Sequence, residues 1–465
     1  MLSWTVAGSA ERVSRRNCLL IGTTGLTGLS LSSLLRADTS VTPRRSIINV
    51  HLDGGPPQLD TIDPKPEAPV EIRGDFASIN TAIPGLRVCE HLPRLAVNAE
   101  RIAWIRTLVG SAGAHDAFQC QSGFSEKDLK SLGGRPALGC VASRLLGKTT
   151  DPAPTFVDLM QGRALVRNSA RPGFLGPSCQ PFRPDLSQLF PRQLEPGMTR
   201  ELARLGKDHQ ISLTLHGDLS ADRVRTRQHL LRSFDAFRRD ADRSGMMEAM
   251  DRFGEQALGI LTSGRLAAAL DLAAEDSVVL ERYQARTTDG SLPSTTSDGP
   301  GATRKFLLAR RLVEAGVRCV SLSISDFDTH SSNFPRLEKL LPIIDVGLSA
   351  LLEDLDERGM LDEVLIVVWG EFGRTPRIDP KTGGRHHWPQ VGPALLIGGG
   401  LRSGVVIGET DREAGDVLSR PVHYKDVFAT LYRQLGLPAS RTTLLDPQGR
   451  PQHLLDSGEP IRELI

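Results

Sequence analysis

Six short apolar runs, each followed by turn-forming or polar residues, constrain the fold of this chain more than any other feature. Runs of this length bounded by Gly, Pro and Asp are typical of buried β-strands. Helical patterns lie between several of them, at 304–315, 337–357 and 425–435. Strands that alternate with helices predict an α/β fold, with a mainly parallel sheet covered by helices on both faces. The expected strands are 47–52, 102–108, 155–160, 317–324, 364–369 and 394–397.

Residues 185–300 interrupt this alternation. They contain long Arg- and Asp-rich helical stretches, such as 221–243, and then a segment rich in Ser, Thr, Gly and Pro at 287–301. We interpret the region as a helical insertion and linker within a single domain that spans residues 38–465. Because acidic residues alternate with the arginines, the charged stretch is typical of a solvated helix face. The formal net charge of +1 for the whole chain also argues against a nucleic-acid partner.

Residues 1–37 have the pattern of an export signal. The twin arginines Arg15 and Arg16 precede an apolar run, extending to Leu35, that Gly, Thr and Ser dilute. This pattern is typical of signals read by the twin-arginine export machinery, and it predicts a periplasmic or extracellular location. A cytosolic amphipathic helix is the alternative. Cleavage after Ala37 is less strongly indicated than export, since Leu35 departs from the small-x-small rule.

Acidic, imidazole and hydroxyl side chains follow several of the expected strands. In an open α/β sheet the ligand site lies beyond the carboxyl ends of the strands, so we expect these side chains at one edge. Mixed Asp and His sets suit Zn²⁺, Mn²⁺ or iron, and two such cations can hold a phosphoryl or sulfuryl group. For any single residue a turn or helix cap is the alternative. The set comprises Asp53, Asp60, Asp63, Ser111, His115, Asp116, Asp326, Asp328, His330, Glu371, Arg374, His386 and His387.

A series of short motifs is spread along the chain: GGP at 54–56, LDTIDPKP at 59–66, IRG at 72–74, CEHLP at 89–93, DTH at 328–330, GEFGRTP at 370–376, GRHHWP at 384–389 and GGG at 398–400. Together they resemble the domain-of-unknown-function 1501 family over nearly the whole chain after the leader. This family is described as sulfatase-like, and the resemblance implies an alkaline-phosphatase-like α/β/α sandwich. Because no activity is established for the family, the resemblance implies a fold more firmly than a reaction.

The resemblance also implies metal ligands. Enzymes of the alkaline-phosphatase-like superfamily place an acidic residue after the first strand, where this chain has Asp53. They use an Asp/His pair at a later strand end, which Asp326 or Asp328 with His330 resembles. The family usually has an Asp-His dipeptide where this chain has two adjacent histidines, starting at His386. An imidazole there replaces an anion by a neutral donor, which we expect to weaken or re-specify the site.

The position of the nucleophile departs from the superfamily pattern. His115 lies where the superfamily has a Ser, Thr or formylglycine, and Ser111 is the nearest hydroxyl. Cys140 begins a loose sulfatase-type motif, CVASR, but 137–146 is typical of an ordinary helix, which favours a buried core cysteine. Covalent transfer through a side chain is therefore doubtful.

The sequence favours an exported, metal-dependent hydrolase of phosphate or sulfate esters. Its substrate would be a small anionic ester or a sulfated or phosphorylated polymer. Arg374 is the candidate clamp for the anionic group, and His115 a general acid/base or a ligand. The alternative is a non-catalytic binding or structural protein at the cell surface that keeps the fold. One or two divalent cations are expected, with ligands from Asp53, Asp328, His330, Glu371, His386 and His387.

Overall fold

The computed structural model describes most of the chain after the predicted leader: residues 45–115, 117–125, 128, 133–148, 150–161, 170–187, 189–190, 264–285, 298 and 301–465. The predicted export signal, Asp116 and most of the predicted insertion, including its helix at 221–243, lie outside these residues. Among the described helices, none combines the length and the apolar character needed to cross a membrane.

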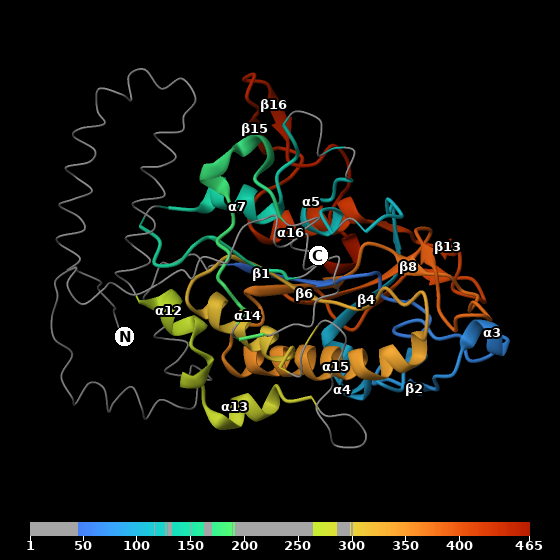
Figure 1. Cartoon of the computed structure of the whole chain (residues 1–465). Helices are drawn as coiled ribbons and strands as arrows, with labels where there is room; N and C mark the ends of the chain where they lie inside the picture. The colour runs from blue at the N-terminus through green and yellow to red at the C-terminus, as the bar shows by residue number, and fades with distance from the viewer. Residues whose placement is uncertain are drawn as a thin grey trace, which may run out of the picture. The chain divides into compact units, whose positions relative to one another are not determined.

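An eight-stranded sheet lies at the centre of residues 45–465, and it contains all six strands expected from the apolar runs (Figure 1). The strands are ordered β11-β4-β10-β7-β1-β6-β5, with β14 also paired to β4. Only β10 runs against the others, antiparallel to both β4 and β7. The bounds are β1 Ser46–Leu52, β4 Ile102–Val109, β5 Phe156–Leu159, β6 Cys319–Ile324, β7 Val364–Trp369, β10 Gly392–Gly398, β11 Val406–Ile407 and β14 Val422–His423.

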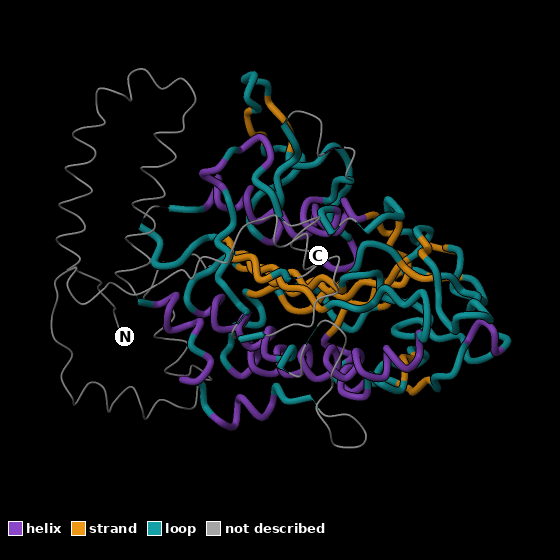
Figure 2. The backbone as a smooth tube through the Cα atoms, viewed as in Figure 1, coloured by secondary structure: helices purple, strands orange, loops and turns teal. Residues whose placement is uncertain are grey.

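Helices cover both faces of the sheet, which confirms the expected α/β/α sandwich with a mainly parallel sheet (Figure 2). One face is covered by α4 (Pro93–Val97), α14 (Arg304–Glu314) and α15 (Asn333–Glu357). The other is covered by α5 (Gln119–Ser122), α7 (Leu138–Leu146) and α16 (Tyr424–Gln434). Each central strand is therefore buried on both sides, which explains its mostly apolar sequence.

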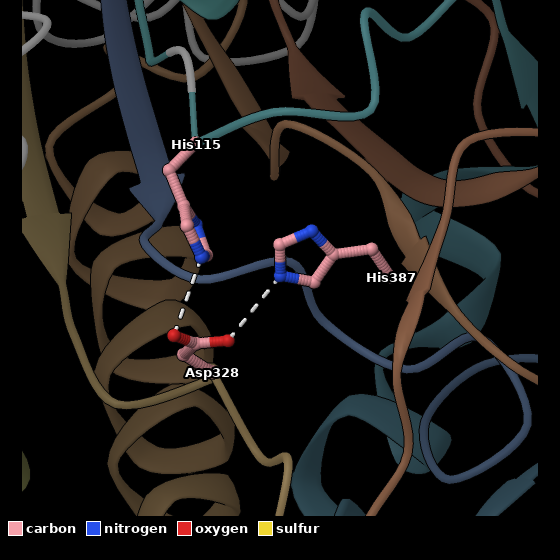
Figure 3. Close-up of side chains that lie close together, drawn as sticks. All are labelled: His115, Asp328 and His387. Atoms are coloured by element: carbon pink, nitrogen blue, oxygen red, sulfur yellow. Dashed lines mark ion pairs between the residues drawn. The ribbon is translucent and has the colours of Figure 1, made fainter.

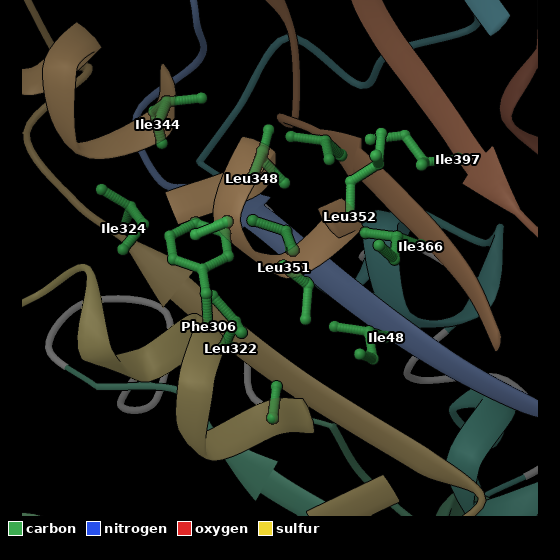
Figure 4. Close-up of a cluster of buried hydrophobic side chains, with 14 of the residues drawn as sticks. Ile48, Phe306, Leu322, Ile324, Ile344, Leu348, Leu351, Leu352, Ile366 and Ile397 are labelled. Carbon is green, nitrogen blue, oxygen red and sulfur yellow. The ribbon is translucent and has the colours of Figure 1, made fainter. Parts of the chain in front are cut away.

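The core beneath α15 shows how the strands are fixed between the layers. Alternate side chains of β1 point to opposite faces, so that Ile48 belongs to one core cluster and Ile47 to the other. Leucines of α15 and Phe306 of α14 pack on Ile48 and its neighbours in the adjacent strands (Figure 4). Gly347 of α15 allows this close approach, since a Cβ there would lie 2.4 Å from the Phe306 ring.

Smaller elements surround the sandwich. The part of the predicted insertion at 264–285 is helical, and its α12 contacts α14 through the Arg311 guanidinium, which donates to two α12 carbonyl oxygens. These elements are α3 Val70–Arg73, β2 Ser78–Asn80, β3 Arg87–Cys89, α12 Arg265–Leu270, α13 Ser277–Arg282, β8 Gly373–Arg374, β9 His387–Trp388, β12 Glu409–Thr410, β13 Val417–Ser419, β15 Thr443–Leu445 and β16 Pro451–His453, with 3₁₀ turns at Ala99–Arg101, Gly173–Leu175, Pro177–Cys179, Leu272–Ala274 and Arg462–Leu464.

The direction of β10 matters for the site. The carboxyl ends of β1, β4, β6 and β7 lie at one edge of the sheet. Because β10 is antiparallel, the segment that precedes it, which includes the β8–β9 hairpin, begins at that same edge. Loops from five strands therefore meet at one place.

Candidate metal centre

Three imidazoles surround one carboxylate at this edge, and two of them, His115 and His387, are drawn with Asp328 in Figure 3. His115 follows β4, Asp328 and His330 follow β6, and His387 lies on β9. The Nε2 atom of His115 is 3.2 Å from Asp328 Oδ2, and those of His330 and His387 are 3.1 and 3.6 Å from Asp328 Oδ1. Between 18 and 46% of each of these four side chains is exposed, so the group is reachable from solvent. We call these four residues the outer group.

The distances among Asp328, His330 and His387 fit ligands of a tetrahedral cation. A zinc ion bound at about 2.05 Å would hold its ligand atoms about 3.3 Å apart. The Nε2 atoms of His330 and His387 are 3.0 Å apart, and each is within 3.6 Å of Asp328 Oδ1. Two imidazole nitrogens this close to each other and to a carboxylate need a shared cation or proton between them.

The opposite ring nitrogens of these imidazoles contact other groups. His115 Nδ1 is 2.9 Å from Glu371 Oε1, and His387 Nδ1 donates to the carbonyl oxygen of Gly113 at 3.4 Å. His330 Nδ1 is 3.0 Å from the Nδ1 of His386. Metal-bound histidines almost always donate their second N–H to such an acceptor, which fixes the ring and the tautomer. The outer group has this arrangement.

A second group lies deeper, at the end of β1. His51 Nε2 is 3.4 Å from Glu371 Oε2 and 3.9 Å from Asp53 Oδ1, and the three ligand atoms all lie within 4.8 Å of one another. At most 8% of any of these side chains is exposed. Within the described structure, neither ring nitrogen of His51 nor Glu371 Oε2 has a hydrogen-bond partner. Such orphaned buried groups are costly, so this inner group also fits a cation. Glu371 links it to His115 of the outer group.

Electrostatics set the charges of the outer group. Burial lowers the pKa of His115, but its hydrogen bonds to Asp328 and Glu371 outweigh this and raise it to about 9. Burial alone would raise the pKa of Asp328, yet His115, His387 and Arg374 hold it well below its usual range. Burial, with nearby Arg374, lowers the pKa of His330, so this ring is neutral.

In the inner group, the pKa shifts favour the protonation states that bind metals. Burial lowers the pKa of His51, which is therefore neutral at pH 7. Burial alone would raise the pKa of Glu371, but the hydrogen bond from His115 lowers it. A neutral imidazole and an ionised carboxylate are the forms in which these side chains bind metals.

Arg374 lies beneath Asp328, fully buried. Its guanidinium donates to Asp328 Oδ1 at 2.7 Å, to the carbonyl oxygens of Gly55 and Arg385 at 3.1 and 2.9 Å, and to that of Gly54. We expected Arg374 to bind an anionic substrate, but its N–H donors form hydrogen bonds within the protein. In this position it orients Asp328 and anchors the turn after β1.

Phe372, on the loop after β7, packs against two of the imidazoles. Its ring stacks on His387 with 4.2 Å between centroids, and it is 5.3 Å from the ring of His115. Gly55 lies against this ring at a φ of +85°, and a Cβ there would be 2.4 Å from Phe372. The glycines after β1 therefore permit the close packing that holds the imidazoles in place.

Two other acidic residues of the expected set have structural partners. Asp60 forms a bidentate ion pair with the buried Arg385, at 2.8 Å for both nitrogens. Asp63 pairs with Lys65 and with Arg106, at 3.1 and 3.4 Å. Both aspartates follow the first strand, but neither is in the outer or inner group.

The loop before β9 is docked on the loop after β6. His386 lies there, and its Nδ1 faces His330 while its Nε2 is 3.1 Å from Asp379 Oδ2. Both ring nitrogens thus point to partners other than Asp328, although we expected a ligand at this position. Asp326 is also turned elsewhere: it has a φ of +80°, and its carboxylate lies 3.9 Å from Arg336.

The candidate nucleophiles are occupied or buried. The Ser111 hydroxyl donates to the carbonyl oxygen of Glu371 at 2.5 Å and accepts from the Gly113 N–H at 3.0 Å, as in a turn. Cys140 is a fully buried residue of α7, and burial raises the pKa of its thiol well above the usual value. This agrees with the core cysteine favoured by the sequence.

The sequence patterns did not identify four residues of the site: His51, Phe372, Asp379 and Arg385. His51 is the one ionisable side chain inside the apolar run 47–52, and that position is a signal which could have identified it. Phe372 and Arg385 lie inside motifs that were recognised, but nothing in their spacing predicts burial. Asp379 lies in a loop whose path depends on backbone contacts between distant segments.

Comparisons with known proteins find one family match and several distant structural likenesses. Residues 44–465 match the family model described as "Protein of unknown function (DUF1501)". A search of curated proteins finds no match. Similar solved structures include Ps i-CgsB in complex with k-i-k-neocarrahexaose (11% identity, 84% of this chain and 72% of that chain, TM-score 0.34), the phosphonate monoester hydrolase SpPMH from Silicibacter pomeroyi (11%, 84% and 72%, 0.31) and the phosphonate monoester hydrolase of Agrobacterium radiobacter (14%, 90% and 77%, 0.33). These likenesses are distant.

Proposed function

The chain belongs to the family described as Protein of unknown function (DUF1501), and we propose that it is a metal-dependent hydrolase of phosphate or sulfate esters. The observation that carries this proposal is the outer group, in which three imidazole Nε2 atoms lie within 3.6 Å of the carboxylate oxygens of Asp328. Three imidazoles and one carboxylate are a donor set that suits Zn²⁺, Mn²⁺ and iron.

Two cation sites are supported by the geometry. His115, Asp328, His330 and His387 would hold the outer cation, and His51, Asp53 and Glu371 the inner one. The orphaned Nε2 of His51 and the orphaned Glu371 Oε2 support the inner site, because a cation would satisfy both atoms. Bound divalent cations would polarise the ester oxygens and make water a nucleophile near neutral pH.

The protein groups have separate tasks in this mechanism. Water, rather than a side chain, attacks the phosphorus or sulfur, since Ser111 is held in its turn and Cys140 is buried in the core. Arg374 keeps Asp328 ionised and fixed in orientation. Phe372 holds the rings of His115 and His387. The anionic part of the substrate binds at the partly exposed outer group, and the rest of the ester, small or polymeric, extends into solvent.

The twin arginines Arg15 and Arg16 support export to the periplasm or beyond. Export through the twin-arginine route would deliver a chain already folded around its metal. Changing both arginines to Lys should keep the protein in the cytoplasm, as cell fractionation would show. Equal export of the two proteins would contradict this assignment and favour the cytosolic-helix alternative.

Elemental analysis and ester hydrolysis test the function together. The protein lacking residues 1–37 should contain one or two equivalents of Zn, Mn or Fe after loading, and it should hydrolyse 4-nitrophenyl phosphate or 4-nitrophenyl sulfate. Asp328→Asn should lose the outer cation and at least a hundredfold in kcat/KM. Asp362→Asn, at an exposed position, is the matched control and should lose neither.

The outcomes separate the hydrolase from the binding protein. Absence of metal in the loaded wild-type protein would overturn the proposal. Bound metal without turnover on any phosphate or sulfate ester would favour the non-catalytic surface protein, which keeps the fold and the site but not the reaction.

A further inference from the structure

We infer that His386 and Asp379 form a positioning relay that fixes the tautomer of His330 and so makes its Nε2 a metal ligand. The inference deepens the proposed function and rests on it. His386 then acts behind His330 and does not bind the outer cation itself. The juxtaposition that carries it is an unbroken line of three side chains: Asp379 Oδ2 is 3.1 Å from His386 Nε2, and His386 Nδ1 is 3.0 Å from His330 Nδ1.

When each imidazole carries a single proton, the hydrogen-bond donors and acceptors along this line have one consistent assignment. The Asp379 carboxylate can only accept, and its other oxygen already accepts from the Lys381 backbone N–H at 2.8 Å. His386 must therefore carry its proton on Nε2, which leaves Nδ1 as a lone pair. This lone pair accepts from His330, whose proton must then lie on Nδ1. His330 Nε2 is left as a lone pair that faces Asp328 and His387.

The opposite tautomer of His330 would prevent it from binding a cation in the outer group. With a proton on Nε2, His330 would present an N–H to the place where the cation belongs, and an imidazole binds metal only through an unprotonated nitrogen. His115 and His387 have acceptors of fixed polarity behind them, a carboxylate and a carbonyl. Behind His330 lies another imidazole, which can donate or accept. Asp379 is the residue that decides between the two.

Backbone contacts hold the three residues of the relay in position. The segment 379–384 closes on itself through hydrogen bonds between Asp379 and Gly384 and between Gly383 and Asp379. It docks on the loop after β6, where the Thr382 hydroxyl donates to the carbonyl oxygen of His330 at 2.8 Å. A Cβ on Gly384 would lie 2.1 Å from the His330 backbone, so the two loops are in close contact.

Substitutions at position 386 test the relay. His386 is about half exposed, so changes there should leave the fold intact. His386→Phe keeps a ring but removes the acceptor, and it should shift His330 to the Nε2–H tautomer and weaken Zn²⁺ binding 10- to 100-fold. Asp379→Asn should act in the same direction. His386→Asp should restore both properties, because a carboxylate accepts directly from His330 Nδ1–H. His453→Ala, on β16, is the control for removal of a histidine.

Two readouts separate this inference from the proposed function. The tautomer of His330 is read from the ¹⁵N shifts of histidine-labelled, metal-free protein, with His330→Gln to assign the signals among the 11 histidines. Zn²⁺ affinity is read by competition with a chromophoric chelator. An unchanged tautomer and affinity in His386→Phe would overturn the relay, as would a failure of His386→Asp to restore them. If wild-type protein binds no Zn²⁺, the proposed function is wrong, and the tautomer of His330 in the variants still tests the relay.

Discussion

Asp53 and Asp60 are carboxylates in the same segment after β1, and their surroundings give them different roles. Asp60 faces the buried Arg385, whose two nitrogens neutralise it, so it stabilises the loops. Asp53 lies beside His51 and Glu371, a neutral imidazole and a second carboxylate, which complete the donor set of the inner group. At the scale of single residues, the neighbours of a carboxylate, rather than its position in the sequence, decide which of these two aspartates is a candidate ligand.

The pKa of His115 predicts how metal binding depends on pH. This pKa is about 9 because Asp328 and Glu371 accept from both ring nitrogens. A cation at the outer site must displace the proton on Nε2, so the apparent Zn²⁺ affinity should rise about tenfold per pH unit between pH 7 and 9. Calorimetry in buffers of different ionisation enthalpy should find about one proton released per outer cation at pH 7.5. Binding without proton release would contradict His115 as a ligand.

The turn after β1 should be intolerant of any side chain. Gly54 has a φ of +112°, and a Cβ there would lie 2.3 Å from the backbone nitrogen of Asp328. Gly54→Ala should therefore displace Asp328 and lower Zn²⁺ affinity at least tenfold. Gly85→Ala is the matched control, since Gly85 also has a positive φ, of +81°, but no atom within 4 Å of the added Cβ. If the two substitutions lowered the metal affinity equally, the cause would be backbone strain rather than contact with Asp328.

At the scale of elements, sequence patterns predicted the strands and long helices closely, because both faces of the sheet are buried. Apolar runs such as 364–369 match β7 residue for residue. The pattern could not predict that β10 runs antiparallel, since a doubly buried strand has the same composition in either direction. The convergence of His115, Asp328 and His387 was also predicted, from the rule that ligands bind at strand ends. The places of Arg374 and His386 were not, because they depend on which loop contacts which.

One contact between elements makes folding sensitive to pH. Asp345 of α15 accepts from the backbone N–H groups of Arg94 and Leu95 at 3.1 and 2.8 Å, and so caps the start of α4. Burial nevertheless raises its pKa to about 6. An acid with a raised pKa stabilises the fold below its unfolded pKa of about 4, and this stabilisation is lost as the pH rises through 6. The loss between pH 4 and 7 should reach about 3 kcal/mol.

Asp345→Asn isolates this effect from that of the other carboxylates. Urea titrations at several pH values measure the free energy of unfolding of both proteins. From pH 4 to 7, the wild type should lose about 3 kcal/mol of stability relative to the variant. Asp362→Asn, exposed in the turn between α15 and β7, should show a pH-independent difference. A constant difference for Asp345→Asn as well would mean that this carboxyl titrates normally in the folded protein.

At the scale of the whole molecule, the site joins segments that are otherwise held apart by the sheet. The outer group draws on the loops after β4 and β6 and on the β8–β9 hairpin, and the inner group on β1 and the loop after β7. Each loop is also anchored by buried contacts, among them the pair of Asp60 with Arg385. The protein is therefore folded around the site before a cation arrives. A cation then binds only where all of these segments are in place.

This coupling predicts that metal binding stabilises the whole fold. Because the unfolded chain has no assembled site, a ligand at 100 times its Kd should add about 2.7 kcal/mol to the free energy of unfolding. Chelator-treated protein should thus unfold at a lower temperature than protein loaded with Zn²⁺, and the difference should grow with Zn²⁺ concentration. Asp328→Asn should lose most of this increase, while Asp362→Asn should keep it. If Zn²⁺ binds with measurable affinity yet leaves the unfolding temperature unchanged, or if it stabilises Asp328→Asn as much as wild type, the cation is bound elsewhere and the three imidazoles around Asp328 are not its site.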